Sequence, residues 1–223
     1  MITADVAIHP VPELRARFAS LIEAASNAAI DERGGFTMAV PGGSAAEALL
    51  PALVASSIDW DRVSVFWVDE RMVPPEHADS NFRVAKEVWL DRVPLSPSRV
   101  HGMVGEASEY AKLLPARLDL VLLGVGADGH VASLFPGHRL LRAWDRDVAV
   151  LDDAPKPPAR RMTLTLRAIT AARRVVVFAA GPEKSAAIAD ALKNEDSELP
   201  LALATLGAGP FSFLLDPAAA AAL

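Results

Sequence analysis

An acid and a base lie two residues apart in a glycine-rich segment near the middle of the chain. Residues 119–137 read DLVLLGVGADGHVASLFPG and include Asp128 and His130. Residues 120–123 are continuously apolar, as in a strand buried on both faces of a parallel sheet. Ligands of open α/β sheets bind at the carboxyl ends of such strands, so the pair is a candidate for acid–base catalysis. The alternative is a helix start that Asp128 caps, with His130 as a surface residue.

A second glycine-rich turn follows the apolar residues 36–40. Gly42, Gly43 and Ser44 stand between that predicted strand and a predicted helix, where backbone N–H groups and the helix dipole favour a phosphate. Ser44 and Glu47 also have the spacing of a capping box, in which the glutamate folds back onto the first N–H groups. A carboxylate at that position would repel a phosphate, and the spacing alone leaves both interpretations open.

Basic side chains follow other predicted strands. Arg71 comes two residues after Asp69 where a buried strand ends, so it either binds an anion or pairs with that aspartate. Lys156 lies between two prolines on a stiff loop, and Arg161 follows a few residues later. Lys184 stands at the start of a helix, where a cation is unfavourable unless an anion accompanies it. The alternative for Lys156 is ordinary surface charge, and the alternative for Lys184 is a first-turn lysine with no role in binding.

Composition excludes several classes of function. The 223 residues carry a net charge of −6 and are 52% hydrophobic, which predicts one domain over residues 1–223 and argues against nucleic-acid binding. There is no cysteine, and the histidines lack metal-ligand spacing, so neither a disulfide nor a metal site is expected. The apolar runs are too short to cross a membrane. The N-terminus lacks the features of a signal peptide, so we expect a cytoplasmic protein.

Strand and helix patterns alternate along the chain, which predicts an α/β fold with a mostly parallel central sheet and helices on both faces. Ser80 and Asn81 are expected to cap one of the helices. The last two strands, residues 199–206 and 211–215, are expected at sheet edges. The other expected helices are 12–30, 44–55, 81–90, 106–114 and 182–192, and the other expected strands are 36–40, 63–68, 119–124, 148–151, 162–166 and 175–178.

Together these segments resemble the 6-phosphogluconolactonase family, which shares its fold with glucosamine-6-phosphate deaminases and ribose-5-phosphate isomerases. The most specific matches are WVDERMVP with Asp79-Ser80-Asn81, and the glycine-rich segment 119–137. The weaker matches are Gly42-Gly43-Ser44, Pro155-Lys156-Pro157, Arg161-Met162-Thr163 and Gly181 with Lys184. The resemblance implies a modified Rossmann fold and hydrolysis of 6-phospho-D-glucono-1,5-lactone, the second step of the oxidative pentose phosphate pathway.

The resemblance also implies roles for these residues. His130 would be the general base, and Asp128 would orient it and raise its pKa if the two are close. Arg71 and Lys156 would hold the sugar acid or the developing oxyanion. The 6-phosphate would be bound by Ser44, the amides of Gly42 and Gly43, Lys184 and Arg161. No metal or organic cofactor is expected, and the expected partner is the small phosphorylated sugar lactone, with neither nucleic acid nor membrane.

This sequence departs from the family pattern in the phosphate loop, where Ala45 and Ala46 replace the usual Thr-Pro after the serine. One alternative is a glucosamine-6-phosphate deaminase, but that family places a carboxylate a few residues after the histidine, and residues 131–136 contain none. The other alternative is a non-catalytic sugar-phosphate sensor. Related sensors carry a DNA-binding helix-turn-helix, and we expect none in the short acidic N-terminal segment.

Overall fold

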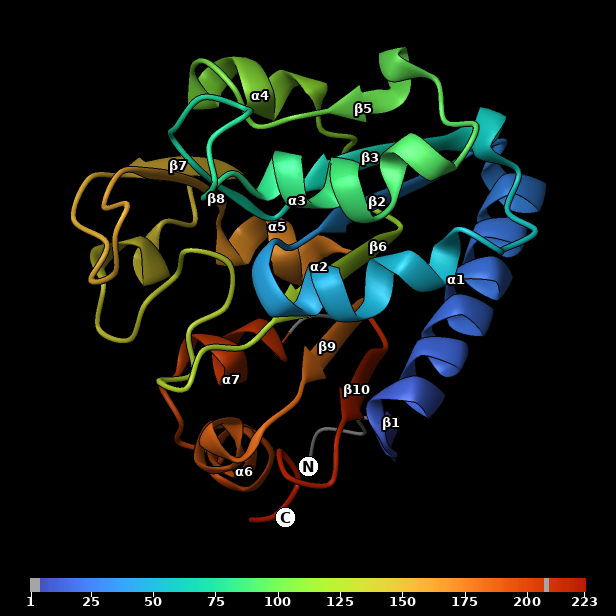
Figure 1. Cartoon of the computed structure of the whole chain (residues 1–223). Coiled ribbons are helices and arrows are strands. Elements are labelled where there is room, and N and C mark those ends of the chain that lie inside the picture. The colour runs from blue at the N-terminus through green and yellow to red at the C-terminus, as the bar shows by residue number, and fades with distance from the viewer. Residues whose placement is uncertain (1–4, 207–208) are drawn as a thin grey trace.

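A seven-stranded parallel sheet forms the centre of the computed structural model, which describes residues 5–206 and 209–223 (Figure 1). The mostly parallel central sheet expected from the sequence is therefore confirmed. In spatial order, the strands are β1 (Asp5–Ile8), β10 (Phe211–Leu215), β9 (Val175–Ala179), β6 (Leu120–Gly124), β2 (Phe36–Val40), β3 (Val63–Trp67) and β5 (Val100–His101).

Two groups of helices cover the sheet. The connections β1–β2–β3–β5 advance in one direction and β5–β6–β9–β10 in the other, so right-handed crossovers place their helices on opposite faces. The first group is α1 (Val11–Arg33), α2 (Gly43–Leu49) and α3 (Asn81–Val88), which lie side by side in Figure 1. The second group is α4 (Ala107–Leu113), α5 (Leu166–Ala171), α6 (Ser185–Lys193) and α7 (Pro200–Ala204). Short 3-10 turns are η1 (Leu50–Leu53), η2 (Trp60–Arg62), η3 (Leu90–Arg92), η4 (Pro97–Arg99), η5 (Arg139–Arg142) and η6 (Pro182–Lys184).

The direction of the strand order reverses between β2 and β6. The chain leaves β2 toward one edge of the sheet and leaves β6 toward the other, so the connections after these two neighbouring strands diverge. Such a reversal opens a crevice at the carboxyl ends of the strands. The glycine-rich turns after residues 40 and 124 both lie at this crevice.

A small antiparallel sheet extends the molecule beyond the carboxyl end of β3. It consists of β4 (Asp69–Arg71), β8 (Arg161–Leu164) and β7 (Val148–Leu151), and its register pairs Arg71 with Arg161. The sequence predicted β7 and most of β8 but not β4 or this separate sheet. Because β4 begins two residues after β3 ends, it carries Asp69 and Arg71 directly to the crevice.

The last third of the chain differs from expectation in two places. Residues 200–204 form helix α7, not an edge strand, and Leu201, Ala202 and Ala204 are buried. A short apolar run fits either element, and Pro200 in the first turn favours the helix. Strand β10 is an inner strand, because β1, which the sequence did not predict, occupies the edge.

Other element boundaries follow from single residues. The helix expected over residues 44–55 gives way to a 3-10 turn at Leu50, because Pro51 cannot continue the α-helical hydrogen bonds. Helix α1 ends at Gly34, which adopts a left-handed conformation with φ of 78°. None of the helices in the described part of the chain combines the length and the apolar character needed to cross a membrane.

A buried tyrosine ties helix α4 to the end of β3. The hydroxyl of Tyr110 accepts a hydrogen bond of 2.9 Å from the backbone N–H of Trp67, and both side chains are almost completely buried. Trp67 is the last residue of β3, directly before the segment that carries Asp69 and Arg71. This contact therefore fixes the point at which the chain enters the crevice.

Replacing this hydroxyl tests its contribution to stability. Tyr110→Phe should lower the free energy of unfolding by about 1–3 kcal/mol, because it leaves the buried N–H of Trp67 without an acceptor. Urea denaturation followed by circular dichroism measures the change, with Leu113→Ala as a control on the exposed face of the same helix. An unchanged denaturation midpoint for Tyr110→Phe would contradict the proposed role of the contact.

Candidate active site

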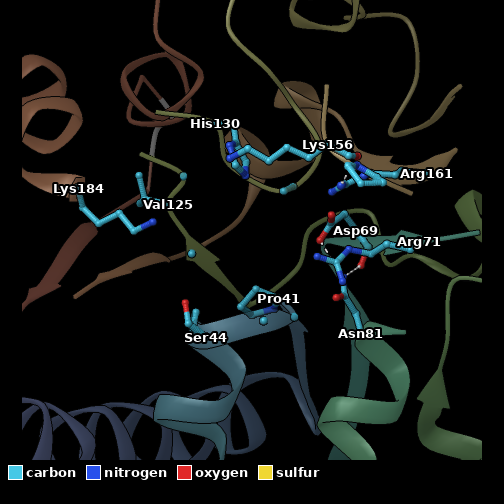
Figure 2. A pocket seen from close by; sticks show the side chains of 17 residues that line it. Pro41, Ser44, Asp69, Arg71, Asn81, Val125, His130, Lys156, Arg161 and Lys184 are labelled. Atoms are coloured by element: carbon cyan, nitrogen blue, oxygen red, sulfur yellow. Dashed lines mark hydrogen bonds between the residues drawn. The ribbon is translucent and has the colours of Figure 1, made fainter. Parts of the chain in front are cut away.

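A pocket of about 320 Å³ lies at the crevice between β2 and β6 (Figure 2). Eight of the nine site residues expected from the sequence line it: Gly42, Gly43, Ser44, Arg71, His130, Lys156, Arg161 and Lys184. The ninth, Asp128, is hydrogen-bonded to His130. Five separate segments of the chain thus bring their polar side chains to one cavity.

His130 and Asp128 form a hydrogen-bonded pair. The Nδ1 atom of His130 lies 2.5 Å from Oδ1 of Asp128, so their expected proximity is found. The tight turn that holds them is closed by the N–H of Gly126, which donates to the carbonyl of His130 at 2.9 Å. A Cβ atom at Gly126 would collide with both side chains of the pair, so glycine is required there. The turn does not continue into a helix, so the interpretation of a helix start is wrong.

Burial sets the direction of the pKa shift at His130. The side chain is 18% exposed and packs against Phe135, with ring centroids 4.9 Å apart. Desolvation lowers the pKa of His130 below its ordinary value, and this effect outweighs the hydrogen bond and charge of Asp128, which raise it. The charge of Lys156 lowers it further. Asp128 therefore acts in the expected direction, but the expected net rise of the pKa is wrong.

Ser44 and Lys184 lie at one end of the pocket, while Arg71, Arg161 and Lys156 lie toward the other (Figure 2). Helix α2 begins after Gly42 without a side-chain cap, and Glu47 is exposed, so the capping box is not formed. The amino end of α2 is therefore open to the pocket. A Cβ atom at Gly42 would collide with the side chain of Asn81, which explains the glycine at that position.

Arg71 does not pair with Asp69. Its Nη1 atom donates to the backbone carbonyl of Asp79 at 2.7 Å, and its buried Nε atom has no hydrogen-bond partner. Asp69 instead accepts hydrogen bonds from Ser133 at 2.6 Å and from the side-chain amide of Asn81 at 3.2 Å. The ion pair considered as an alternative is therefore wrong. Arg71 keeps a positive charge at the pocket that no carboxylate of the described residues neutralises.

A buried glutamate anchors the start of α3 beside the pocket. The Glu70 carboxylate accepts hydrogen bonds from the backbone N–H groups of Asn81 and Phe82 at 2.8 and 2.7 Å. Burial raises the pKa of Glu70, and the hydrogen bonds to the carboxylate counteract this shift. Ser80 caps the helix as expected, by accepting from the N–H of Arg83. This capping positions the side chain of Asn81 against Gly42 in the loop that begins α2.

Arg161 holds the loop that carries Lys156. Arg161 is only 4% exposed, and it donates to the carbonyls of Pro158 at 3.0 Å and Lys156 at 2.9 Å. Burial lowers its pKa, and the charge of Asp69 counteracts the shift. Figure 2 shows the side chain of Lys156 extending from this loop toward His130. These contacts favour a positioning role for Arg161, and its binding of phosphate stays a prediction.

The sequence did not predict three buried residues beside the pocket: Asp69 as a hydrogen-bond acceptor, Asn81 and Ser133. Asn81 could have been suspected from its place directly after the capping Ser80. Ser133 carried no signal, since its partner Asp69 lies 64 positions away in the chain. Within the described ranges, no group of three or more His, Cys, Asp or Glu side chains is arranged to hold a metal ion.

The arrangement suits attack of water on a carbonyl compound that bears an anionic group. A histidine with a lowered pKa is unprotonated near neutral pH and can take a proton from water. The cationic side chains can stabilise a developing oxyanion at one end of the pocket and bind a fixed anion at the other.

Comparison with known proteins gives consistent matches. The family model described as glucosamine-6-phosphate isomerases/6-phosphogluconolactonase matches residues 11–212. A 6-phosphogluconolactonase of Streptomyces coelicolor is 38% identical over 86% of this chain and 83% of its own. The structure of the 6-phosphogluconolactonase of Trypanosoma brucei covers all of both chains with a TM-score of 0.87 at 28% identity. A monomeric glucosamine-6-phosphate deaminase, at 18% identity and a TM-score of 0.83, covers 98% of this chain and all of its own, and shares the fold alone.

The balance of effects at His130 can be measured directly. An NMR titration should place its pKa below the ordinary histidine value of about 6.5, because desolvation is the largest contribution. Asp128→Asn should lower it further, because it removes the carboxylate that favours the protonated ring. Asp145→Asn, at an exposed aspartate that pairs with Arg146, is the control and should change nothing. A pKa above 6.5, or no response to Asp128→Asn, would contradict this account.

Proposed function

Because the chain belongs to the family of glucosamine-6-phosphate isomerases and 6-phosphogluconolactonases, we propose that it hydrolyses 6-phospho-D-glucono-1,5-lactone to 6-phospho-D-gluconate. The observation that carries this proposal is the pocket itself, which joins the His130–Asp128 pair to the open phosphate loop and Lys184. The reaction is the second step of the oxidative pentose phosphate pathway.

His130 is the general base in this proposal. Its Nδ1 proton is donated to Asp128, which leaves Nε2 unprotonated. Nε2 takes a proton from water as the water oxygen attacks C1 of the lactone. The imidazolium then returns the proton to the ring oxygen as the C1–O bond breaks, which yields the open-chain acid. Asp128 stabilises the imidazolium between these steps, without itself becoming protonated.

The other site residues act at two ends of the substrate, the reacting carbonyl group and the 6-phosphate. Arg71 and Lys156 stabilise the negative charge that develops on the C1 carbonyl oxygen during attack. Ser44, the amides of Gly42 and Gly43, and Lys184 bind the 6-phosphate at the other end of the pocket. Arg161 keeps Lys156 in place; because it lies at the end of the pocket away from Ser44 and Lys184, the phosphate contact that the resemblance implies for it is not part of this proposal. No step requires a metal or an organic cofactor.

The pocket favours this reaction over a deaminase reaction. Residues 131–136 contain no acid, and Val131, Ser133 and Leu134 are fully buried. Among the described residues that line the pocket, Asp69 is the only acidic one, and hydrogen bonds from Ser133 and Asn81 occupy it. A non-catalytic sensor would bind the phosphorylated sugar without turnover, so measured activity distinguishes a sensor from an enzyme.

A single domain over residues 1–223 and a cytoplasmic location remain parts of the proposal.

Removal of the general base tests the chemical step. His130→Asn should lower kcat by roughly 10²-fold or more, because the amide cannot accept a proton near neutral pH. Activity of the unmodified enzyme should fall only in the acid range below the ordinary histidine pKa, where the imidazole becomes protonated. A coupled assay with freshly generated lactone measures both, after subtraction of spontaneous hydrolysis. Near-full kcat in a folded His130→Asn variant would exclude His130 as the base.

Removal of the phosphate contact tests the binding step. Lys184→Ala should raise KM by roughly ten- to a hundredfold, since a hydrogen bond to a charged group contributes about 1.5–3 kcal/mol. The change should appear in KM more than in kcat, because the phosphate is bound alike in ground and transition states. Lys112→Ala, at an exposed lysine that pairs with Glu109, is the control. Equal turnover of phosphorylated and unphosphorylated gluconolactone would contradict the proposed binding of phosphate by the Gly-Gly-Ser loop.

A further inference from the structure

A second polar pocket, of about 260 Å³, lies at the opposite end of the central sheet from the candidate active site. It is lined by the residues that precede and begin the strands, while the active site follows their carboxyl ends. Strand β2 connects the two, with Phe36 and Thr37 at this pocket and the phosphate loop beyond Val40. At about 3.3 Å per residue, five residues of strand separate the two sites by roughly 17 Å.

Five arginines line this second pocket, and the topology explains why they meet. In the sheet order β9-β6-β2-β3-β5, each strand has an arginine that lines the pocket one to three residues before its first residue, and β9 is also preceded by Arg174, which does not line it. Adjacent strands lie about 4.8 Å apart, so these arginines follow one another in a row along this end of the sheet. The arginines are Arg173, Arg117, Arg33, Arg62 and Arg99, in the order of those strands.

Among the described residues that line this pocket, Asp119 is the acidic one, and its hydrogen bonds are already occupied. Its Oδ1 atom pairs with Arg33 at 3.0 Å and with Arg173 at 3.4 Å. Its Oδ2 atom accepts from the backbone N–H and the hydroxyl of Thr37 at 2.9 and 2.8 Å. Arg33 also pairs with Glu32, so the two carboxylates neutralise at most the charges of Arg33 and Arg173.

The other three arginines have no acidic partner among the residues that the structure describes. Arg62 donates to the backbone carbonyl of Gly34 at 3.3 Å, and Arg117 donates to that of Ala171 at 2.8 Å. These bonds hold the two guanidinium groups in place while their remaining N–H donors stay available. The side chain of Arg99 makes no hydrogen bond to the described residues. Fixed guanidinium groups without a counter-charge are the usual means of binding phosphate oxygens.

We propose that this pocket, lined by Arg33, Arg62, Arg99, Arg117 and Arg173, binds a compact anion that contains a diphosphate group. The number of unneutralised arginines calls for an anion with more charge than a single phosphate, and the volume accommodates a small molecule. In a chain with a net charge of −6, such a ligand is attracted by the local row of arginines and not by the protein as a whole. The proposal is independent of the catalytic activity.

Calorimetric titration with inorganic pyrophosphate tests this proposal. The titration uses full-length Lys184→Ala protein, so that the phosphate subsite of the candidate active site is weakened. Pyrophosphate should still bind, and Arg62→Gln/Arg99→Gln in the same background should weaken binding by roughly tenfold or more. The matched control is Arg142→Gln/Arg146→Gln, which removes the same charge at exposed positions and should leave the affinity unchanged.

Further ligands define which group is recognised. ADP should bind at least as tightly as pyrophosphate, and AMP more weakly than either, if the diphosphate is the recognised group. Equal affinity of ADP and pyrophosphate identifies the diphosphate alone as sufficient, while tighter binding of ADP adds a contribution of the nucleoside. The proposal is overturned if pyrophosphate does not bind, if AMP binds as tightly as ADP, or if the Arg62→Gln/Arg99→Gln change has no larger effect than the control pair.

Discussion

The reversal of strand order between β2 and β6 is the constraint on which the candidate site depends. Because the chain leaves these two neighbouring strands in opposite directions, no connection covers the gap between their carboxyl ends. The Gly42-Gly43-Ser44 loop follows β2 and the His130 turn follows β6, so the strand order alone brings the two parts of the site together. The small antiparallel sheet closes a further side of the gap and carries Arg71 and Arg161 into it.

Within this gap, the buried carboxylates are hydrogen-bonded to the protein, while cationic side chains face the pocket. Asp69 and Glu70 are both buried, and their carboxylates accept hydrogen bonds from Ser133, Asn81 and neighbouring backbone groups. Arg71, Arg161 and Lys156 consequently have no carboxylate partner among the described residues, while Lys184 pairs with Glu183 at 3.5 Å. A protein with net negative charge thereby keeps a positive pocket for an anionic sugar phosphate.

The sequence predicted those features of the site that depend on residues close together in the chain. Glycines that follow buried strands marked both turns, and Asp128 and His130 lie close enough in sequence for their contact to be expected. Contacts across long separations were not predictable, such as that between Ser133 and Asp69, which brings a buried serine to the site. The pKa of His130 also escaped prediction, because burial against Phe135 is a property of the folded chain. Residues 199–206 were misassigned because a short apolar run fits a strand or a helix.

The central claim is that one substrate spans the pocket, with its phosphate at Ser44 and Lys184 and its reacting carbon at His130. A crystal structure with the product 6-phosphogluconate tests this claim most directly. We expect phosphate oxygens within hydrogen-bond distance of the Ser44 hydroxyl and the Lys184 ammonium, and the C1 carboxylate beside Nε2 of His130. Binding of 6-phosphogluconate in the opposite orientation, with its phosphate among Arg71, Arg161 and Lys156 and its carboxylate at Lys184, would contradict this claim.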